Sequence, residues 1–166
     1  MNTEEVRQHF QAQVSGYPDL MRRIIPFYDE QREMILRLIP FEQDRLFRLL
    51  DLGCGPWSLH HLKLSERPEF FRRAFSSLND GGILIAAEVI IDESRVVREQ
   101  QYQLWCEFMV QNGEDGMHWY GRHLEKDHPV TISSLLAMLS EAGFEAAGCF
   151  WRCLNFAIVS ASRAAA

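Results

Sequence analysis

The segment Leu46-Phe-Arg-Leu-Leu-Asp-Leu-Gly-Cys-Gly55 decides the fold class of this 166-residue chain. Its first seven residues are mostly apolar, which is typical of a strand buried on both faces of a parallel sheet. The glycines that follow let the backbone approach a ligand closely. Ligands of such sheets bind at the carboxyl ends of the strands. The segment therefore predicts a buried strand over 46–52 and a turn after it that is either a plain connection or a binding loop.

Helical and extended patterns alternate around this segment. Together they predict a single α/β domain over 1–166, with a mostly parallel sheet, a C-terminal antiparallel hairpin and a helical N-terminal or lid segment over 1–44 that precedes the core at 45–166. Glu88 lies inside an apolar strand, so it needs a partner or a place near the end of that strand. Apolar spacing and capping residues predict helices over 3–14, 19–25, 26–39, 66–78, 94–111 and 132–142. Ser65 is expected to cap the helix over 66–78, and Thr131 the helix over 132–142. Apolar runs predict further strands over 83–91, 144–152 and 155–162.

Composition and charge exclude several classes of protein. Hydrophobic residues make up 47% of the chain and charged residues 24%, as in ordinary globular domains. The formal net charge of −6 disfavours nucleic acid as a partner, because the field of the protein repels phosphate backbones. The longest apolar run, 81–91, is far shorter than the roughly 20 residues that span a bilayer. The first five residues carry no secretory signal, so we expect a cytoplasmic protein whose four cysteines are thiols.

The glycine turn is compared first with the dinucleotide-binding pattern G-x-G-x-x-G. Gly53 and Gly55 fit, but Ser58 occupies the third glycine position, which disfavours an NAD-dependent oxidoreductase. The turn Asp51-Leu-Gly-Cys-Gly55 instead resembles the first motif, D-x-G-x-G, of the class I S-adenosylmethionine-dependent methyltransferases. Other segments resemble that family in the family's own order, and the late ones resemble the branch of the carboxy-S-adenosylmethionine synthases. These segments are residues 23–28, 58–62, 78–83 and 142–157, with Arg122, Asp127 and 152–156 pointing to the branch.

The resemblance implies a Rossmann-like fold, S-adenosylmethionine as cofactor and methyl transfer to a small molecule. It places the cofactor at Asp51, Gly53, Cys54 and Gly55, with His60 lining the pocket and with Arg23 and Tyr28 near the cofactor's carboxylate. As plain sequence, a tyrosine such as Tyr28 is more often a core residue with a solvated hydroxyl. His60 and His61 are adjacent, so only one of them is expected to face the site. The sequence assigns no catalytic residue, and it predicts no metal site because no CxxC spacing occurs.

Residues 117–123 combine aromatic and cationic side chains after a glycine turn. They predict a lid over a small acidic or planar substrate, with Trp119, Tyr120 and Arg122 as substrate-binding residues. The alternative is the start of a helix, with an aromatic anchor in the core and a solvated Arg122.

The family order contains a gap directly after the first motif. Only Pro56, Trp57 and Ser58 separate Gly55 from Leu59, so the second to fourth strands of the family are absent. The usual ribose-binding acid, roughly 20 residues after the glycines, would fall at 71–75, where no acid occurs. Either the chain is internally shortened, or the sequence as written omits a middle segment. Shortening leaves an apolar strand edge at 46–52, which predicts a homodimer. The alternative to an enzyme is therefore a non-catalytic, self-associating methyltransferase-like remnant.

Overall fold

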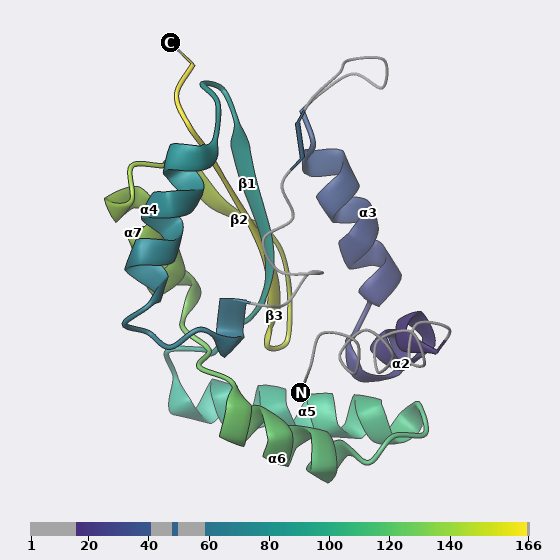
Figure 1. Cartoon of the computed structure of the whole chain (residues 1–166). Coiled ribbons are helices and arrows are strands. Elements are labelled where there is room, and N and C mark those ends of the chain that lie inside the picture. Colours follow the sequence, from purple (N-terminus) through teal and green to yellow (C-terminus); the bar gives the residue numbers. More distant parts are fainter. Residues whose placement is uncertain (1–15, 41–47, 50–58, 166) are drawn as a thin grey trace, which may run out of the picture.

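The computed structural model describes residues 16–40, 48–49 and 59–165 (Figure 1). Its centre is a three-stranded sheet in the order β1-β3-β2, formed by β1 (Ile83–Val89), β2 (Glu145–Cys153) and β3 (Phe156–Ser162). β3 is antiparallel to both neighbours, so β1 and β2 run in the same direction. Phe156 pairs with Val89 and with Cys153, which places the carboxyl ends of β1 and β2 at the same edge of the sheet.

Helices cover both faces of this sheet and one of its ends. Figure 1 shows α4 and α7 on one face, α3 on the other, and α5 and α6 side by side across the edge where β1 ends. None of the described helices combines the length and the hydropathy that a bilayer-spanning segment requires. The helices are α2 (Tyr17–Ile24), α3 (Tyr28–Leu38), the short 3₁₀ helix η1 (Leu59–His61), α4 (Arg67–Ser77), α5 (Arg95–Gln111), α6 (Gly116–Lys126) and α7 (Ile132–Glu141).

The central strand β3 divides two hydrophobic cores. Phe156 and Ile158 point into a first core, shared with α2, α3 and α5, whereas Val159 and Ala161 point into a second core under α4 and α7. Each of these four side chains is buried. This double burial explains why the strand is almost continuously apolar rather than alternating.

The described helices and strands largely match the predicted ones, but neighbouring strands of the sheet pair antiparallel rather than parallel. The C-terminal antiparallel hairpin is confirmed, as are the helices and strands expected after residue 59. The mostly parallel sheet is not found among the described strands, because β3 returns from a tight hairpin and inserts between β1 and β2. A parallel contact occurs as an isolated bridge between Ile90 and Val130. Residues 48 and 49 are not in a strand, and the rest of the strand predicted over 46–52, like the helix over 3–14, lies outside the described residues.

The capping predictions had mixed outcomes. Thr131 caps α7 as expected, accepting a hydrogen bond from the Ser134 amide at 3.2 Å. The prediction for Ser65 is wrong: α4 begins after Glu66, whose side chain does not cap the helix, and a proline occupies the first turn. That proline lacks an N–H that would need a cap.

Residues 117–123 lie within α6, which supports the helical alternative over an irregular lid.

Two glycines of α6 give a matched test of this packing. A Cβ on Gly116 would lie 2.6 Å from the Cys106 carbonyl oxygen of α5, whereas a Cβ on Gly121 would meet nothing within 4 Å. Gly116→Ala is therefore expected to lower the free energy of unfolding by about 1–3 kcal/mol, because the two backbones must separate. Gly121→Ala is expected to raise it by up to about 1 kcal/mol, because alanine favours the helix. Urea unfolding monitored by circular dichroism measures both; equal effects of the two substitutions would contradict the close helix contact.

Candidate functional site

A polar site begins at the carboxyl end of β1. Glu88, the last residue but one of that strand, is 2% exposed, and its Oε1 accepts a hydrogen bond from the Leu59 amide at 2.9 Å. Glu88 thus has both the partner and the position near the strand end that its sequence context demanded. Leu59 opens η1, the first element after residues 50–58. The Glu88 carboxylate therefore fixes the start of η1 at the carboxyl end of β1.

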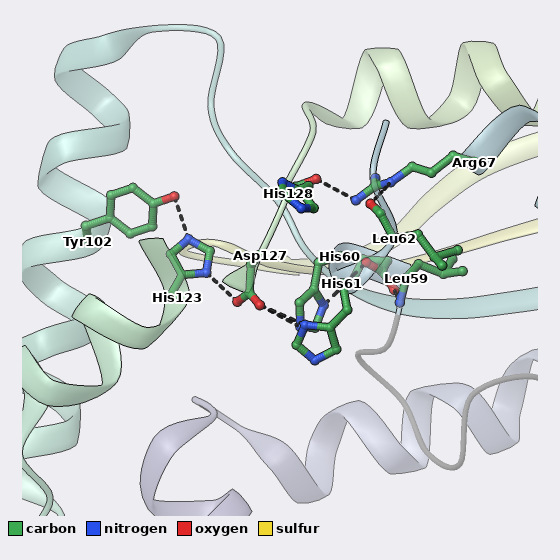
Figure 2. Close-up of polar contacts among 10 residues, drawn as sticks. Leu59, His60, His61, Leu62, Arg67, Tyr102, His123, Asp127 and His128 are labelled. Carbon is green, nitrogen blue, oxygen red and sulfur yellow. Dashed lines mark hydrogen bonds and ion pairs between the residues drawn. The ribbon is translucent and has the colours of Figure 1, made fainter. Parts of the chain in front are cut away.

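Asp127, just after α6, gathers three histidines around one carboxylate (Figure 2). Its Oδ2 is 2.7 Å from His123 Nδ1, and its Oδ1 is 2.8 Å from His61 Nδ1 and 3.8 Å from His60 Nε2. Burial raises the pKa of the Asp127 carboxyl, but the His123 hydrogen bond and the three imidazoles outweigh burial and lower that pKa overall. We call these four residues the histidine–aspartate cluster.

A buried hydrogen-bond chain extends the cluster towards α5. His123 Nε2 lies 2.9 Å from the Tyr102 hydroxyl (Figure 2). Burial, together with the nearby Tyr120 and Asp127, raises the pKa of Tyr102 to about 12. The phenol therefore stays protonated and donates a hydrogen bond to His123 Nε2. The other imidazole nitrogen donates to Asp127. Both imidazole nitrogens of His123 are therefore engaged by other side chains of the protein.

Several buried polar atoms at this edge have no hydrogen-bond partner within the described part of the chain. They are His60 Nδ1, Glu88 Oε2 and both amide atoms of Asn155, whose side chain lies in the turn between β2 and β3. Asn155 is 1% exposed, and His60 Nδ1 lies 3.6 Å from Glu88 Oε2. Because nearly all buried polar groups in proteins are paired, such atoms indicate a site for a polar ligand. Their mixed donors and acceptors fit a ligand with amino, carboxylate and hydroxyl groups, as S-adenosylmethionine has.

An open pocket of about 420 Å³ borders the cluster on the side of α5 and α6. Tyr120, which the sequence proposed as a substrate residue, lines it, and its ring centroid is 5.1 Å from that of Tyr102. Arg98 lines it as well and donates to the Asp92 carbonyl. The lining is thus aromatic and cationic around the Asp127 carboxylate; it consists of Ile91, Arg95, Arg98, Glu99, Tyr102, Tyr120, His123, Leu124, Asp127 and Pro129.

Two other residues named from the sequence, Arg23 and Trp119, meet at Glu114, which lies between α5 and α6. Arg23 Nε binds Glu114 Oε1 at 2.7 Å, and Trp119 Nε1 donates to Glu114 Oε2 at 3.1 Å. The Arg122 guanidinium lies 5.5 Å from the centroid of a Trp119 ring. Neither Arg23, Trp119 nor Arg122 is among the residues that line the pocket beside Asp127. The ion pair of Arg23 with Glu114 joins α2 to the turn between α5 and α6.

Of the remaining predicted cofactor residues, Tyr28 is among the described ones. It is the first residue of α3 and is buried in the first core, which agrees with the alternative of an ordinary core tyrosine. Asp51, Gly53, Cys54 and Gly55 lie outside the described residues. The other cysteines, Cys106, Cys149 and Cys153, are free thiols, as expected.

One expectation about the histidines is wrong, and other site residues were missed. His60 and His61 both approach Asp127, with ring centroids 4.1 Å apart, because the tight turn of η1 brings the two rings over one carboxylate. These three residues form a group of metal-ligating type although the sequence predicted no metal site. The spacing from His123 to Asp127, one helical turn, was a signal that could have been used. No pattern in the sequence indicated that Tyr102 contacts His123 or that Asn155 has a buried amide at this edge.

Comparisons with known proteins give distant relatives. No family model matches the chain. A carboxy-S-adenosyl-L-methionine synthase of Helicobacter hepaticus is 21% identical over 116 residues, which cover 68% of this chain and 48% of the relative. The enzyme of the same name from Pectobacterium atrosepticum is 25% identical over 111 residues, covering 65% of this chain and 45% of the relative. The chain therefore spans about half the length of the curated relatives it matches.

Solved structures with a partial likeness carry methyltransferase names or ligands. PigF with SAH has a TM-score of 0.45 at 18% identity, covering 65% of this chain and 28% of that one. Human N-acetylserotonin methyltransferase in complex with SAM has a TM-score of 0.43 at 16% sequence identity, and the match covers 77% of this chain and 36% of that one. The S-adenosylmethionine-dependent methyltransferase SibL in its apo form has a TM-score of 0.45 at 15% identity, and the match covers 84% of this chain and 41% of that one. The resemblance to class I S-adenosylmethionine-dependent methyltransferases is confirmed, through weak sequence matches to their carboxy-S-adenosyl-L-methionine synthase branch.

Proposed function

We propose that this chain is an S-adenosylmethionine-dependent methyltransferase that acts on a small molecule by in-line methyl transfer. The observation that carries the proposal is the sequence match to carboxy-S-adenosyl-L-methionine synthases in a chain that contains Asp51-Leu-Gly-Cys-Gly55. The contact between Leu59 and Glu88 supports it, because it lies at the carboxyl end of β1 and Leu59 follows this motif closely in the sequence. Ligands of α/β sheets bind at such edges.

The residues around this edge have separate tasks in the proposed reaction. S-adenosylmethionine, when bound, supplies a sulfonium methyl group, and the protein orients the reactants and excludes water. The amides of the 51–55 loop hold the cofactor, with His60 and Asn155 offering buried polar atoms. The pocket at Tyr120 receives the methyl acceptor. His123, held between Asp127 and the Tyr102 hydroxyl, keeps both of these side chains in place beside that pocket.

Thermal unfolding with and without cofactor tests the proposal. S-adenosylmethionine or S-adenosylhomocysteine at about a hundred times its dissociation constant stabilises the folded state by about 2.7 kcal/mol. For a chain of this length that corresponds to a rise of about 5–10 °C in Tm. Adenosine and methionine, added separately at the same concentration, are the controls and should give a smaller rise. An unchanged Tm at about 1 mM of either cofactor form, far above a typical micromolar constant, would contradict cofactor binding.

The second candidate is a non-catalytic, self-associating remnant. It is favoured by the half-length match to the relatives and by Phe71, which is fully buried in α4 close to where a ribose-binding acid is expected. Exposed apolar side chains on α5, among them Val96, Leu104 and Val110, offer surface for a second copy. Sedimentation across the micromolar range separates the candidates: the remnant predicts a concentration-dependent dimer without a cofactor-induced rise in Tm. A monomer with such a rise would exclude it.

A further inference from the structure

We propose that His60, His61 and Asp127 bind a divalent first-row transition metal ion of the Zn²⁺ type. One ligand atom from each residue lies within 4.8 Å of the other two. Two imidazole nitrogens and one carboxylate oxygen are a donor set that zinc uses when a further position stays open to water or substrate. This inference concerns only described residues and does not depend on the proposed methyl transfer.

The distances within the group suit a tetrahedral ion. His61 Nδ1 is 2.8 Å and His60 Nε2 is 3.8 Å from Asp127 Oδ1. Bonds of 2.0–2.1 Å at tetrahedral angles hold ligand atoms about 3.3 Å apart. One observed distance is about half an ångström shorter and the other about half an ångström longer than this spacing. Small rotations of the two imidazoles would therefore complete the site without a change in the backbone.

The surroundings of His60 supply the outer contacts that metal-binding histidines require. Such a histidine nearly always donates its second N–H to a carboxylate or carbonyl, which fixes the ring and leaves the other nitrogen for the metal. His60 Nδ1 faces Glu88 Oε2 at 3.6 Å, and both atoms are buried without a hydrogen-bond partner. The side chains of His60 and Glu88 are only 6% and 3% exposed. His60 Nδ1 thus faces a carboxylate, and Nε2, which faces Asp127, is the nitrogen left for the metal.

Asp127 is held in an equivalent way. His123 Nδ1 binds its Oδ2 at 2.7 Å and is itself held by the Tyr102 hydroxyl. This leaves Oδ1 directed at His60 and His61 (Figure 2). His61 is 59% exposed, so an ion can enter from solvent and keep a water molecule as fourth ligand. His61 Nδ1 binds the ion as an unprotonated nitrogen, so any hydrogen on Nδ1 must move to Nε2 or to solvent.

Metal titration of the tag-free, reduced full chain tests the proposal. We expect one Zn²⁺ per chain in competition with a chromophoric chelator, and a Co²⁺ complex whose visible spectrum shows no thiolate charge-transfer band. His61→Gln should weaken Zn²⁺ binding at least about a hundredfold, since loss of an outer partner alone costs 10–100-fold. The matched control, His118→Gln, changes an exposed histidine of α6 outside the group and should leave binding unchanged.

Three results would overturn the metal site. The first is the lack of stoichiometric Zn²⁺ binding to the folded chain. The second is equal Zn²⁺ affinity in His61→Gln and the parent protein, with circular dichroism showing both folded. The third is loss of binding on combined replacement of Cys106, Cys149 and Cys153 by serine, because these free thiols of the described chain are competing soft ligands. Mg²⁺ should not compete at equal concentration, since it prefers oxygen ligands.

Discussion

Trp105→Ala is expected to lower the free energy of unfolding by about 3–5 kcal/mol, the usual cost of removing a large aromatic side chain from a core. Trp105, on α5, is 6% exposed. Its ring meets those of Phe156 and His123 edge-on, each at a centroid distance of 5.5 Å. Its Nε1 donates to the Ile24 carbonyl at 2.7 Å. One side chain thus joins α2, α5, α6 and β3, so its removal weakens the support of the candidate site.

Two further variants separate the contributions of Trp105. Trp105→Phe keeps an aromatic ring but leaves the Ile24 carbonyl without its donor, which should cost about 1–3 kcal/mol. Leu104→Ala, the adjacent position on α5, removes a half-exposed side chain and should change stability by less than about 0.5 kcal/mol. Urea unfolding monitored by far-ultraviolet circular dichroism measures all three. A loss below about 1 kcal/mol for Trp105→Ala would contradict the described first core.

Asp127→Asn is expected to cost about 1.5–3 kcal/mol at neutral pH, the range for hydrogen bonds to charged groups. The carboxylate of Asp127 is 11% exposed and accepts from His123 and His61, while the amide that replaces it offers only one weaker acceptor oxygen. Asp29→Asn is the matched control, because Asp29 also has a lowered pKa beside an arginine but lies in an exposed ion pair. Its replacement should have a much smaller effect, since exposed pairs contribute little.

The cost of Asp127→Asn should depend on pH. Folding lowers the pKa of Asp127 below its ordinary value of about 3.9, so the unfolded chain takes up this proton first as the pH falls. The stabilisation is therefore complete well above that value and is lost as the pH falls through the lower pKa of the folded state. His60, His61 and His123 face this carboxylate from η1 and α6. The difference in stability between parent and variant should narrow from neutral pH to about pH 3; a constant difference would contradict the cluster.

Local patterns in the sequence predicted most elements of the fold because those elements depend on short-range chemistry. Thr131 caps α7, and Gly143 ends it with a φ of 103°, a conformation that glycine adopts without strain. The direction of the strands was not predictable in this way. An apolar strand such as 83–89 is buried on both faces whether its neighbour is parallel or antiparallel, and only the long-range pairing of β1 with β3 decides between them.

The sequence alone predicted the candidate site only at Glu88, a carboxylate in an apolar strand that needs a hydrogen-bond partner when buried. Glu88 showed that a polar contact must exist within the strand, but the partner, the Leu59 amide, is set by tertiary approach. His60 was selected through the family resemblance. Asp127, which brings His60 and His61 together, belongs to a distant part of the chain, and nothing in the η1 sequence points to it.

The central claim is that an S-adenosyl compound binds this chain at the carboxyl edge of β1. Titration of the ¹⁵N-labelled chain with S-adenosylhomocysteine, followed by amide resonances, tests it most directly. The account predicts saturable shifts at Leu59, His60 and Asn155, which lie at that edge beside the unpaired buried atoms. Shifts confined to the shallow depression at Arg72 and Ala142, on the α4 and α7 face, or no shifts at all, would contradict it.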